Sequence, residues 1–316
     1  MYEKRQFLKF NQNFQHSFTN AKVKWENRES LILSIQREDG TVGYGEIAPT
    51  PGFKNFDMKV AAEEAVKWVK TGKKNDWVAI NSALSCLDLE IWHPSWHPTK
   101  TKINSAKLWM DGDYEIKENA TVKKKIGLMP VQEEIKKLQD WISSYPFEFR
   151  LRLDPNQSLS VDSLNRWIDS FYEEKRIQYI EEPLPNTQLD EMFEITHTSP
   201  ICLALDESII DFGGPMKIKE MGWEGYFILK PTLMEDWKQT ILFIMANQES
   251  SVLSTVFESP FGFEALVRTC SYSQHDPGLS RYILQGNPLE FGEHHQTALM
   301  VPGVSVEKLN HLWNLQ

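Results

Sequence analysis

The first hundred residues combine strand-like and helix-like hydrophobic patterns. Residues 30–35 form an apolar run with β-branched members, Asp39-Gly40 is a strong hairpin-turn signal, and residues 42–46 supply the returning strand. Apolar positions then recur at helical spacing over 58–69, and a second helix is expected over 76–89. The pattern therefore predicts a small α+β unit at the start of the chain.

The middle of the chain has a different pattern, in which short apolar runs alternate with helical stretches. The runs expected to form strands are Ser105–Met110, Ala120–Ile126, Glu148–Leu153, Ile177–Ile180, Ile201–Leu205, Tyr226–Leu229, Ser251–Phe257 and Tyr282–Leu284. Helices are expected between them, as over 131–141, 161–171, 189–196 and 237–247. Strands that alternate with helices indicate parallel pairing, and eight strands are the number that closes a barrel.

The expected fold is therefore an α/β barrel of the TIM type with an attached domain. We expect residues 1–100 to form an α+β capping domain and residues 101–289 to form the catalytic barrel. The last segment, about 290–316, is expected to return to the capping domain. There is no internal repeat and no low-complexity tract.

Composition narrows the classes of partner without selecting a function. The formal net charge of -10 disfavours nucleic acid and anionic membranes as partners. Cys86, Cys202 and Cys270 are far apart in the sequence, which excludes a close-paired zinc cluster and favours buried thiols in a reducing compartment.

No apolar run has the length of a membrane helix, and residues 1–10 lack the apolar core of a signal peptide. We expect a cytoplasmic protein, and the sequence does not distinguish a monomer from a homo-oligomer.

Charged residues stand at the ends of successive predicted strands, at nearly regular intervals. They are Lys123, Lys125, Asp154, Glu181 or Glu182, Asp206 and Lys230. A barrel strand is buried on both faces, so an ionisable group there is costly unless it is paired or bound to metal. Because catalytic groups of these barrels lie at the carboxyl ends of the strands, we expect these residues to converge on one site.

Each of these residues has an ordinary structural explanation when it is taken alone. Lys123-Lys124-Lys125 resembles a solvated basic run, Asp154-Pro155 is typical of a turn, and Asp206 suits a helix start. The strand-like residues before Lys123 argue otherwise, because side chains alternate along a strand and Lys123 and Lys125 would share one face. The pattern as a whole points to a site, since no packing requirement places charges at every strand end.

Three carboxylates on neighbouring strands suit a hard cation with octahedral coordination. Mg²⁺ prefers carboxylate oxygens and keeps positions for water or substrate, with Mn²⁺ as a possible substitute. No two histidines have the spacing of zinc ligands, and His294-His295 lies outside the strand series. We therefore expect a magnesium site built by carboxylates.

Two lysine positions beside such a cation suggest removal of a proton next to a carboxylate. A cation bound to that carboxylate stabilises the enediolate anion that results. A lysine base must be partly neutral near pH 7, although the pKa of free lysine is about 10.4. Neighbouring positive charges lower it, and we expect Lys123 and the metal to act on Lys125 in this way.

At these positions the chain resembles the enolase superfamily, in its muconate-lactonising-enzyme-like subgroup, between Arg28 and Gly262. Sites of this superfamily use a Lys or His base with Mg²⁺, and the resemblance implies a (β/α)7β barrel. The motifs are K-x-K at Lys123–Lys125, Asp154-x-Asn156, Glu181-Glu182-Pro183, Asp206-Glu207-Ser208 and Lys230-Pro231. The resemblance implies Asp154, Glu181 and Asp206 as metal ligands, with Asn156 and Glu207 in the surrounding shell. It implies Lys125 as the base, Lys230 on the opposite face of the substrate and Lys123 on the substrate carboxylate.

Further motifs resemble the o-succinylbenzoate synthase family. They are the capping loop Gly43–Phe53, the Leu-Arg-Leu-Asp pattern ending at Asp154, and the segment Ser254–Gly262. Two departures are Pro155 in place of a common Ala and Thr255 in place of a Ser. The substrate-binding residues that the resemblance implies are Arg152, Ser254, Thr255, Ser259, Pro51, Gly52 and Phe53.

The family's reaction is the syn dehydration of 2-succinyl-6-hydroxy-2,4-cyclohexadiene-1-carboxylate, an anionic dicarboxylate, in menaquinone biosynthesis. Two alternatives remain open. An N-acylamino acid racemase or dipeptide epimerase would also need two lysines on opposite faces, although the D-x-D that dipeptide epimerases use after the last strands is missing. A barrel that binds ligand without catalysis is the second alternative, and the complete set of acid, base and ligand residues disfavours it.

Overall fold

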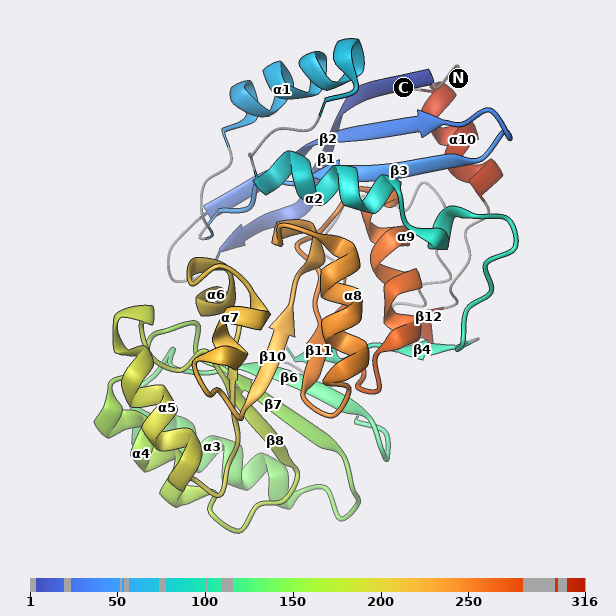
Figure 1. The fold of residues 1–316 in the computed structure, drawn as a ribbon. Helices are drawn as coiled ribbons and strands as arrows, with labels where there is room; N and C mark the ends of the chain where they lie inside the picture. The colour runs from blue at the N-terminus through green and yellow to red at the C-terminus, as the bar shows by residue number, and fades with distance from the viewer. Residues whose placement is uncertain are drawn as a thin grey trace. The chain divides into compact units, whose positions relative to one another are not determined.

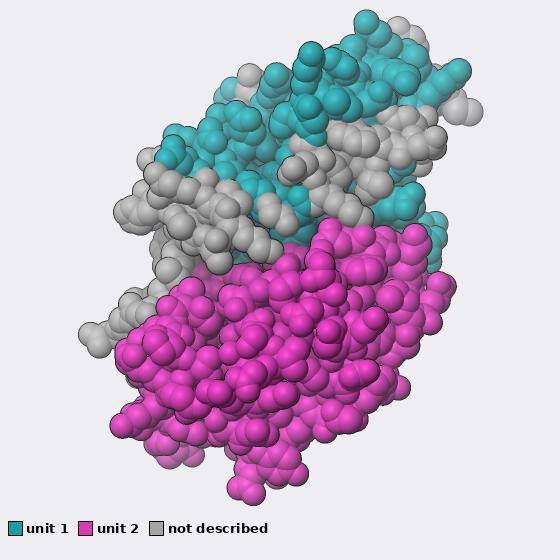
Figure 2. All heavy atoms as spheres, turned by 90° about the vertical axis from the view of Figure 1, so that its left-hand side faces the viewer, with its two compact units in different colours: residues 1–105, 229–316 teal, residues 106–228 magenta. Residues whose placement is uncertain are grey.

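The computed structural model describes residues 4–19, 24–51, 53, 57–73, 78–100, 102–109, 116–280, 299–300 and 306–315. The chain forms two compact units, which Figure 2 colours separately: unit 1 is Met1–Ser105 with Leu229–Gln316, and unit 2 is Ala106–Ile228. No helix in the described part of the chain is long and apolar enough to cross a membrane.

Unit 1 begins with an antiparallel sheet in the order β1-β2-β3. Its strands are β1 (Lys4–Thr19), β2 (Lys24–Gln36) and β3 (Val42–Ile47). Helices α1 (Met58–Thr71) and α2 (Val78–Leu87) pack with this sheet around a core that includes Leu31, Leu33, Ala65 and Leu84 (Figure 1). The predicted α+β character of this region is confirmed.

The close packing of β3 against α2 explains two glycines of the capping motif. A Cβ atom at Gly43 or Gly45 would overlap the backbone carbonyls of Leu87 and Ala83. Only glycine allows the two backbones to approach so closely. The Gly-x-Gly-Glu pattern therefore allows β3 to pack closely against α2, and Glu46 follows directly after the two glycines.

The rest of unit 1 holds shorter elements. They are η1 (Glu90–Trp92), β4 (Ile103–Asn104), η3 (Pro231–Leu233), α8 (Trp237–Ala246), β11 (Ser251–Leu253), α9 (Pro260–Thr269), η4 (Cys270–Tyr272), β12 (Leu299–Met300) and α10 (Val306–Leu315). The amide of Ser254, directly after β11, donates to the carbonyl of Leu229, the last residue of β10. The predicted strand Tyr282–Leu284 lies outside the described residues.

Unit 2 is built from parallel strands that are neighbours in the order of the chain. They are β5 (Lys107–Trp109), β6 (Thr121–Lys125), β7 (Arg150–Asp154), β8 (Ile177–Glu181), β9 (Leu203–Leu205) and β10 (Tyr226–Leu229), whose last residue belongs to unit 1. The helices between them are α3 (Val131–Ser143), α4 (Val161–Ser170), η2 (Asn186–Gln188), α5 (Leu189–Thr198), α6 (Glu207–Asp211) and α7 (Pro215–Glu220). Figure 1 shows α3, α4 and α5 on one side of β6, β7 and β8. The predicted alternation of strand and helix is confirmed here.

Parallel pairing in register brings the strand ends of unit 2 to one edge. Lys125 is the register partner of Asp154, and Glu181 that of Ala204, two residues before Asp206. The carboxyl ends of β6, β7, β8 and β9 therefore lie side by side, as the sequence predicts.

Candidate active site

The lysines of β6 point to opposite faces of the strand. Lys123 and Lys125 both form ion pairs with Asp154 of the next strand. The ammonium of Lys124 instead lies 3.7 Å from the ring centroid of Trp109, which stacks on Trp141. The predicted alternation along this strand is confirmed.

Asp154 is the centre of the ion cluster and is 1% exposed. One of its oxygens, Oδ2, lies 2.7 Å from Nζ of Lys123 and 2.6 Å from Nζ of Lys125. The other, Oδ1, accepts a hydrogen bond of 3.0 Å from the amide of Asn156, and the Asn156 side chain accepts one from Lys125. Asp154 and Asn156 together therefore hold the Lys125 ammonium.

The carboxylates of three strand ends act together on Lys123. Its Nζ lies 2.6 Å from Oε1 of Glu181, in addition to its contact with Asp154. Burial alone would lower the pKa of Lys123, but Asp154, Glu181 and Asp206 outweigh it and hold that pKa well above its usual value. The nearby carboxylates therefore favour the protonated form of Lys123, which contacts Asp154 and Glu181 directly.

The same contacts keep Asp154 ionised. Burial would raise the pKa of its carboxyl, but the charges and hydrogen bonds of Lys123 and Lys125 lower it well below its usual range. Two ammonium groups on one carboxylate oxygen make Asp154 a permanent anion.

Glu181 and Glu182 have different surroundings, although both are buried. The carboxylate of Glu182 accepts hydrogen bonds from the amide of Asp206, at 2.6 Å, and from the amide and hydroxyl of Ser208. Burial, and then the charge of Glu207, raises the pKa of Glu182 well above its usual value. Glu182 thus holds the backbone of the next strand end, whereas Glu181 contacts Lys123.

Arg152 precedes Asp154 by two residues and so lies on the same face of β7. It is 2% exposed, donates from Nε to Gln178, and its guanidinium lies 5.3 Å from the ring centroid of Tyr179. Its Nη2 finds no hydrogen-bond partner among the described residues. A buried guanidinium nitrogen without a partner is a costly feature that an anionic group would relieve.

Tyr179 belongs to this cluster and was not among the residues predicted from the sequence. It is 1% exposed, pairs in register with Arg152, and burial raises its pKa well above the usual value. The sequence could have identified Tyr179, because side chains alternate along a strand and Tyr179, two residues before Glu181, shares its face.

Lys230 lies in unit 1, directly after β10, and is 7% exposed. Its ammonium is 4.6 Å from the ring centroid of Phe53, a contact typical of a cation–π interaction. Phe53 is one of three predicted substrate-binding residues of the capping loop. Pro51 is half-buried, and Gly52 lies outside the described residues.

The segment Ser254–Gly262, in which substrate contacts are predicted, forms many hydrogen bonds within the protein. The hydroxyl of Thr255 donates to Glu258, and both the amide and the hydroxyl of Ser259 donate to Glu46. Ser259 is completely buried, whereas Ser254 is half-buried. Thr255 and Ser259 therefore have partners within the protein, and the contact of these two residues and of Ser254 with a substrate stays a prediction.

The donor chemistry of unit 2 fits a hard divalent cation. Asp154, Glu181 and Asp206 are carboxylates, the ligand type that such a cation prefers, and all three raise the pKa of Lys123. Within the described ranges, however, no three His, Cys, Asp or Glu side chains are arranged so as to hold a metal ion. Because the Lys123 ammonium contacts both Asp154 and Glu181, a metal cation would have to displace it or share these oxygens.

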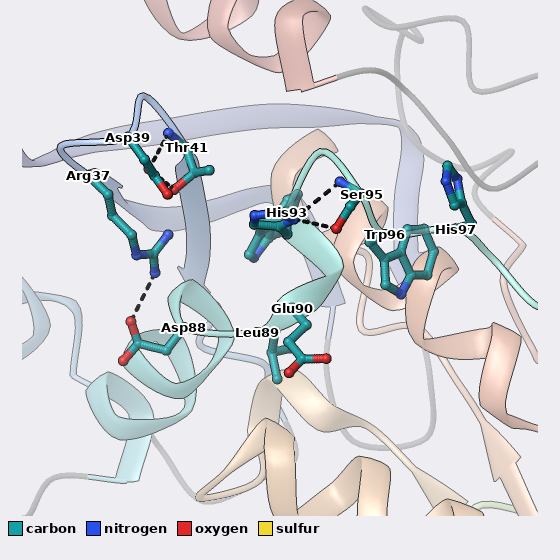
Figure 3. Close-up of a pocket in the computed structure, with 11 residues that line it drawn as sticks. Arg37, Asp39, Thr41, Asp88, Leu89, Glu90, His93, Ser95, Trp96 and His97 are labelled. Atoms are coloured by element: carbon teal, nitrogen blue, oxygen red, sulfur yellow. Dashed lines mark hydrogen bonds and ion pairs between the residues drawn. The ribbon is translucent and has the colours of Figure 1, made fainter.

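A separate hollow of about 680 Å³ lies in unit 1 (Figure 3). Its lining includes Arg37, Asp88, His93 and Trp96, and Figure 3 shows the ion pair between Arg37 and Asp88. None of the predicted site residues lines it. The hollow is therefore distinct from the charged cluster of unit 2.

Comparison with known proteins places these features in a family context. Residues 109–222 match the family model described as Enolase C-terminal domain-like. The o-succinylbenzoate synthase of Thermosynechococcus vestitus is 26% identical over 261 residues, which cover 72% of this chain and 75% of that protein.

Two solved structures show the fold. The o-succinylbenzoate synthase of Thermosynechococcus elongatus BP-1, complexed with magnesium in its active site, superposes with a TM-score of 0.76 at 20% identity, covering 99% of this chain and 100% of that one. The L-Ala-D/L-Glu epimerase of Bacillus subtilis gives a TM-score of 0.69 at 13% identity, covering 95% of each chain. These likenesses confirm the predicted class, an α/β barrel of the enolase type with an α+β capping domain. The chain is therefore similar to the o-succinylbenzoate synthases in sequence and in fold, and its residues 109–222 match the Enolase C-terminal domain-like family.

Proposed function

We propose that this protein is an o-succinylbenzoate synthase, a hydro-lyase that dehydrates 2-succinyl-6-hydroxy-2,4-cyclohexadiene-1-carboxylate to 2-succinylbenzoate in menaquinone biosynthesis. The observation that carries the proposal is the cluster in which Lys123 and Lys125 share one oxygen of Asp154 at the end of β7. The sequence relatives, which bear this enzyme's name, support the choice of reaction.

The proposed cofactor is Mg²⁺, held by Asp154, Glu181 and Asp206. When bound, it supplies positive charge that stabilises the negative charge developing on the substrate's ring carboxylate. In this proposal Asn156 and Glu207 belong to the shell around the ligands. Glu182 supports the arrangement, because its carboxylate accepts a hydrogen bond from the amide of Asp206. Lys123 adds a permanent cation for the same carboxylate.

Lys125 is the proposed acid–base group. In its neutral form its amine takes the proton from the ring carbon that carries the carboxylate. The resulting ammonium then returns a proton to the departing hydroxyl on the same face, so that the C–O bond breaks, water leaves and the ring becomes aromatic. Asp154 and Asn156 orient Lys125 for both transfers through the contacts described above.

Two further groups complete the proposal. Lys230 is the second cation, on the opposite face of the substrate ring, where it stabilises the anionic intermediate. Arg152 offers its unpaired Nη2 to an anionic group of the substrate. The capping loop with Phe53 excludes water when the substrate is bound.

The test is the loss of absorbance of the cyclohexadiene substrate with purified protein and Mg²⁺, repeated with excess chelator. We expect rapid, metal-dependent loss, and a decrease in kcat of about 10²- to 10⁴-fold in Lys125→Ala, as for removal of a general base. Lys124→Ala is the matched control, because its side chain lies on the opposite face over Trp109. If the wild-type protein binds the metal and leaves the substrate unchanged, the synthase assignment is wrong, and deuterium exchange at the α-carbon of N-acyl amino acids tests the racemase alternative.

A further inference from the structure

Glu258 is a completely buried carboxylate that joins two loops of unit 1. Its Oε2 accepts hydrogen bonds from the Thr255 hydroxyl, at 2.6 Å, and from the Val256 amide, at 3.1 Å, in the loop after β11. Its Oε1 accepts a hydrogen bond of 2.9 Å from the hydroxyl of Thr232 in η3, after β10. One side chain therefore connects the segments that follow two strands.

Thr232 belongs to the short turn that begins at Lys230. The amide of Leu233 donates to the carbonyl of Lys230 at 2.9 Å, which closes the turn directly behind the lysine. The carbonyl of Pro231 accepts from the buried hydroxyl of Ser82 in α2, also at 2.9 Å. The orientation of Lys230 thus depends on this turn, and Ser82 and Glu258 hold the turn from two directions.

The loop that carries Glu258 is itself held firmly. Glu46 accepts from the amide and hydroxyl of Ser259 and from the amide of Gly262, where any Cβ atom would overlap the Glu46 carboxylate. Arg28, also buried, donates to the carbonyl of Phe257 at 3.2 Å. These contacts fix the conformation of the loop. Glu258 is therefore held in place and can in turn hold the turn after β10.

The backbone of Phe257 shows how strongly this loop is constrained. Its φ of 61° is left-handed, a conformation that a bulky residue rarely adopts. Such residues persist where surrounding contacts impose the conformation, and they concentrate at functional sites. Buried carboxylates are also costly, and an apolar side chain would serve packing alone. The cost is explained if the network has a task beyond packing.

We propose that Glu258 is a positioning residue for Lys230, acting through the Thr232 hydroxyl. The inference rests on the proposed function, in which Lys230 is the cation on the second face of the substrate ring. A cation that acts in the transition state must be placed accurately, since a displacement of about 1 Å can reduce a rate about 10²-fold. Glu258 transmits the rigidity of the loop after β11 to the turn that bears this lysine.

The test uses Thr232→Val, which replaces the hydroxyl with a methyl group of similar size and removes only the link to Glu258. We expect kcat to fall about 10- to 100-fold with KM nearly unchanged, because the lost interaction belongs to the transition state. Thr232→Ser restores the hydroxyl and should recover the wild-type kcat. Thr269→Val is the matched control, because Thr269 is equally buried but donates to the carbonyl of Ala265 in its own helix.

A second readout follows Lys230 without reference to catalysis. In protein labelled with ¹³C at the lysine ε-carbon, Lys230 should give a signal shifted by the ring current of Phe53, assigned by its disappearance in Lys230→Arg. This signal should move in Thr232→Val and stay in place in Thr269→Val and Thr232→Ser. An unmoved signal in Thr232→Val would overturn the positioning role, as would a loss of kcat in Thr232→Ser equal to that in Thr232→Val. If the wild-type protein does not dehydrate the substrate, the proposed function fails, and the signal still decides whether Glu258 positions Lys230.

Discussion

The chemistry of individual residues depends on which neighbour each one meets. Lys123 and Lys124 are adjacent and identical in type, yet one contacts two carboxylates and the other lies over an indole ring. The alternation of a strand is sufficient to predict this difference from the sequence. The sequence predicts that Lys123 and Glu181 lie in one site, but their direct contact depends on how β6 and β8 flank β7, which only the structure shows.

At the same scale, Glu182 should matter for metal binding although it is not a proposed ligand. Its carboxylate holds the amide of Asp206 and both donors of Ser208, so Glu182→Ala should leave Asp206 poorly placed. Groups that orient metal ligands typically change affinity about 10- to 100-fold when they are removed. We expect a decrease of this size in Mn²⁺ affinity, measured by electron paramagnetic resonance titration.

Glu182→Gln is the control for this prediction. Its amide oxygen can still accept from the Asp206 amide, and its NH₂ group can donate to the Ser208 hydroxyl, so the affinity should stay near that of the wild type. Wild-type affinity in a folded Glu182→Ala variant would show that Asp206 needs no such support.

The ion pairs of Asp154 predict a pH dependence of stability in the metal-free protein. Because Lys123 and Lys125 outweigh burial and lower the pKa of Asp154 from 3.8, the folded state binds this proton more weakly than the unfolded state. The ion pairs therefore stabilise the fold above pH 3.8, and that stabilisation is lost as the pH falls below this value. In urea titrations below this pH, the unfolding free energy of the wild type should fall more steeply than that of Asp154→Asn, by up to about 1.4 kcal/mol per pH unit.

Asp162→Asn provides the comparison, because Asp162 is exposed and pairs with Arg166 along one helix. Its stability should follow the wild-type pH dependence. Equal slopes for the wild type and Asp154→Asn would mean that the buried ion pairs do not stabilise the folded chain.

The elements that the sequence predicts best are those with one buried face and one exposed face. Helices α3 and α4 bury one stripe of side chains and begin close to where the periodicity places them. Helix α9 was not predicted, because all ten of its residues are buried, including Glu264 and Arg268, and no polar face marks its period. Strand β1 was missed as well, since its mixed and charged sequence becomes a strand through pairing with β2.

Helix α8 offers a prediction at this scale that is independent of catalysis. Asp236 caps the helix, and its side chain accepts from the amide of Gln239 at 3.0 Å. Asp236→Ala should lower the free energy of unfolding by about 1 kcal/mol, as is usual for loss of an N-cap. Urea denaturation measures the change, and Asp236→Asn, which retains a capping oxygen, should cost much less. Equal losses in the two variants would indicate that the cap does not stabilise the helix.

For the whole molecule, the order of strands was predictable and the division into units was not. The capping domain predicted over 1–100, with its return at 290–316, stays a prediction. The two compact units have other bounds, because the chain divides after Ser105 and after Ile228. The second division falls inside β10, one residue before the end of the strand, where no hydrophobic pattern could mark it. The candidate site residues could be proposed from the sequence because they recur at strand ends, whereas the contacts of Glu258 and Ser259 depend on tertiary packing.

The last prediction concerns the response of the whole chain to the proposed metal. A ligand that binds only the folded state stabilises it by about 2.7 kcal/mol at a concentration of 100 times its Kd. Part of this gain should be offset here, because the contacts of Lys123 with Asp154 and Glu181 must be broken or shared when a metal enters. We expect the melting temperature to rise with Mg²⁺ concentration, and Asp206→Asn to lose most of the rise while Asp162→Asn keeps it. Lys123→Met removes the competing ammonium, so the metal-free protein should melt lower but respond more strongly to Mg²⁺. A smaller response in Lys123→Met than in the wild type would show that the lysine and the metal do not compete for these carboxylates.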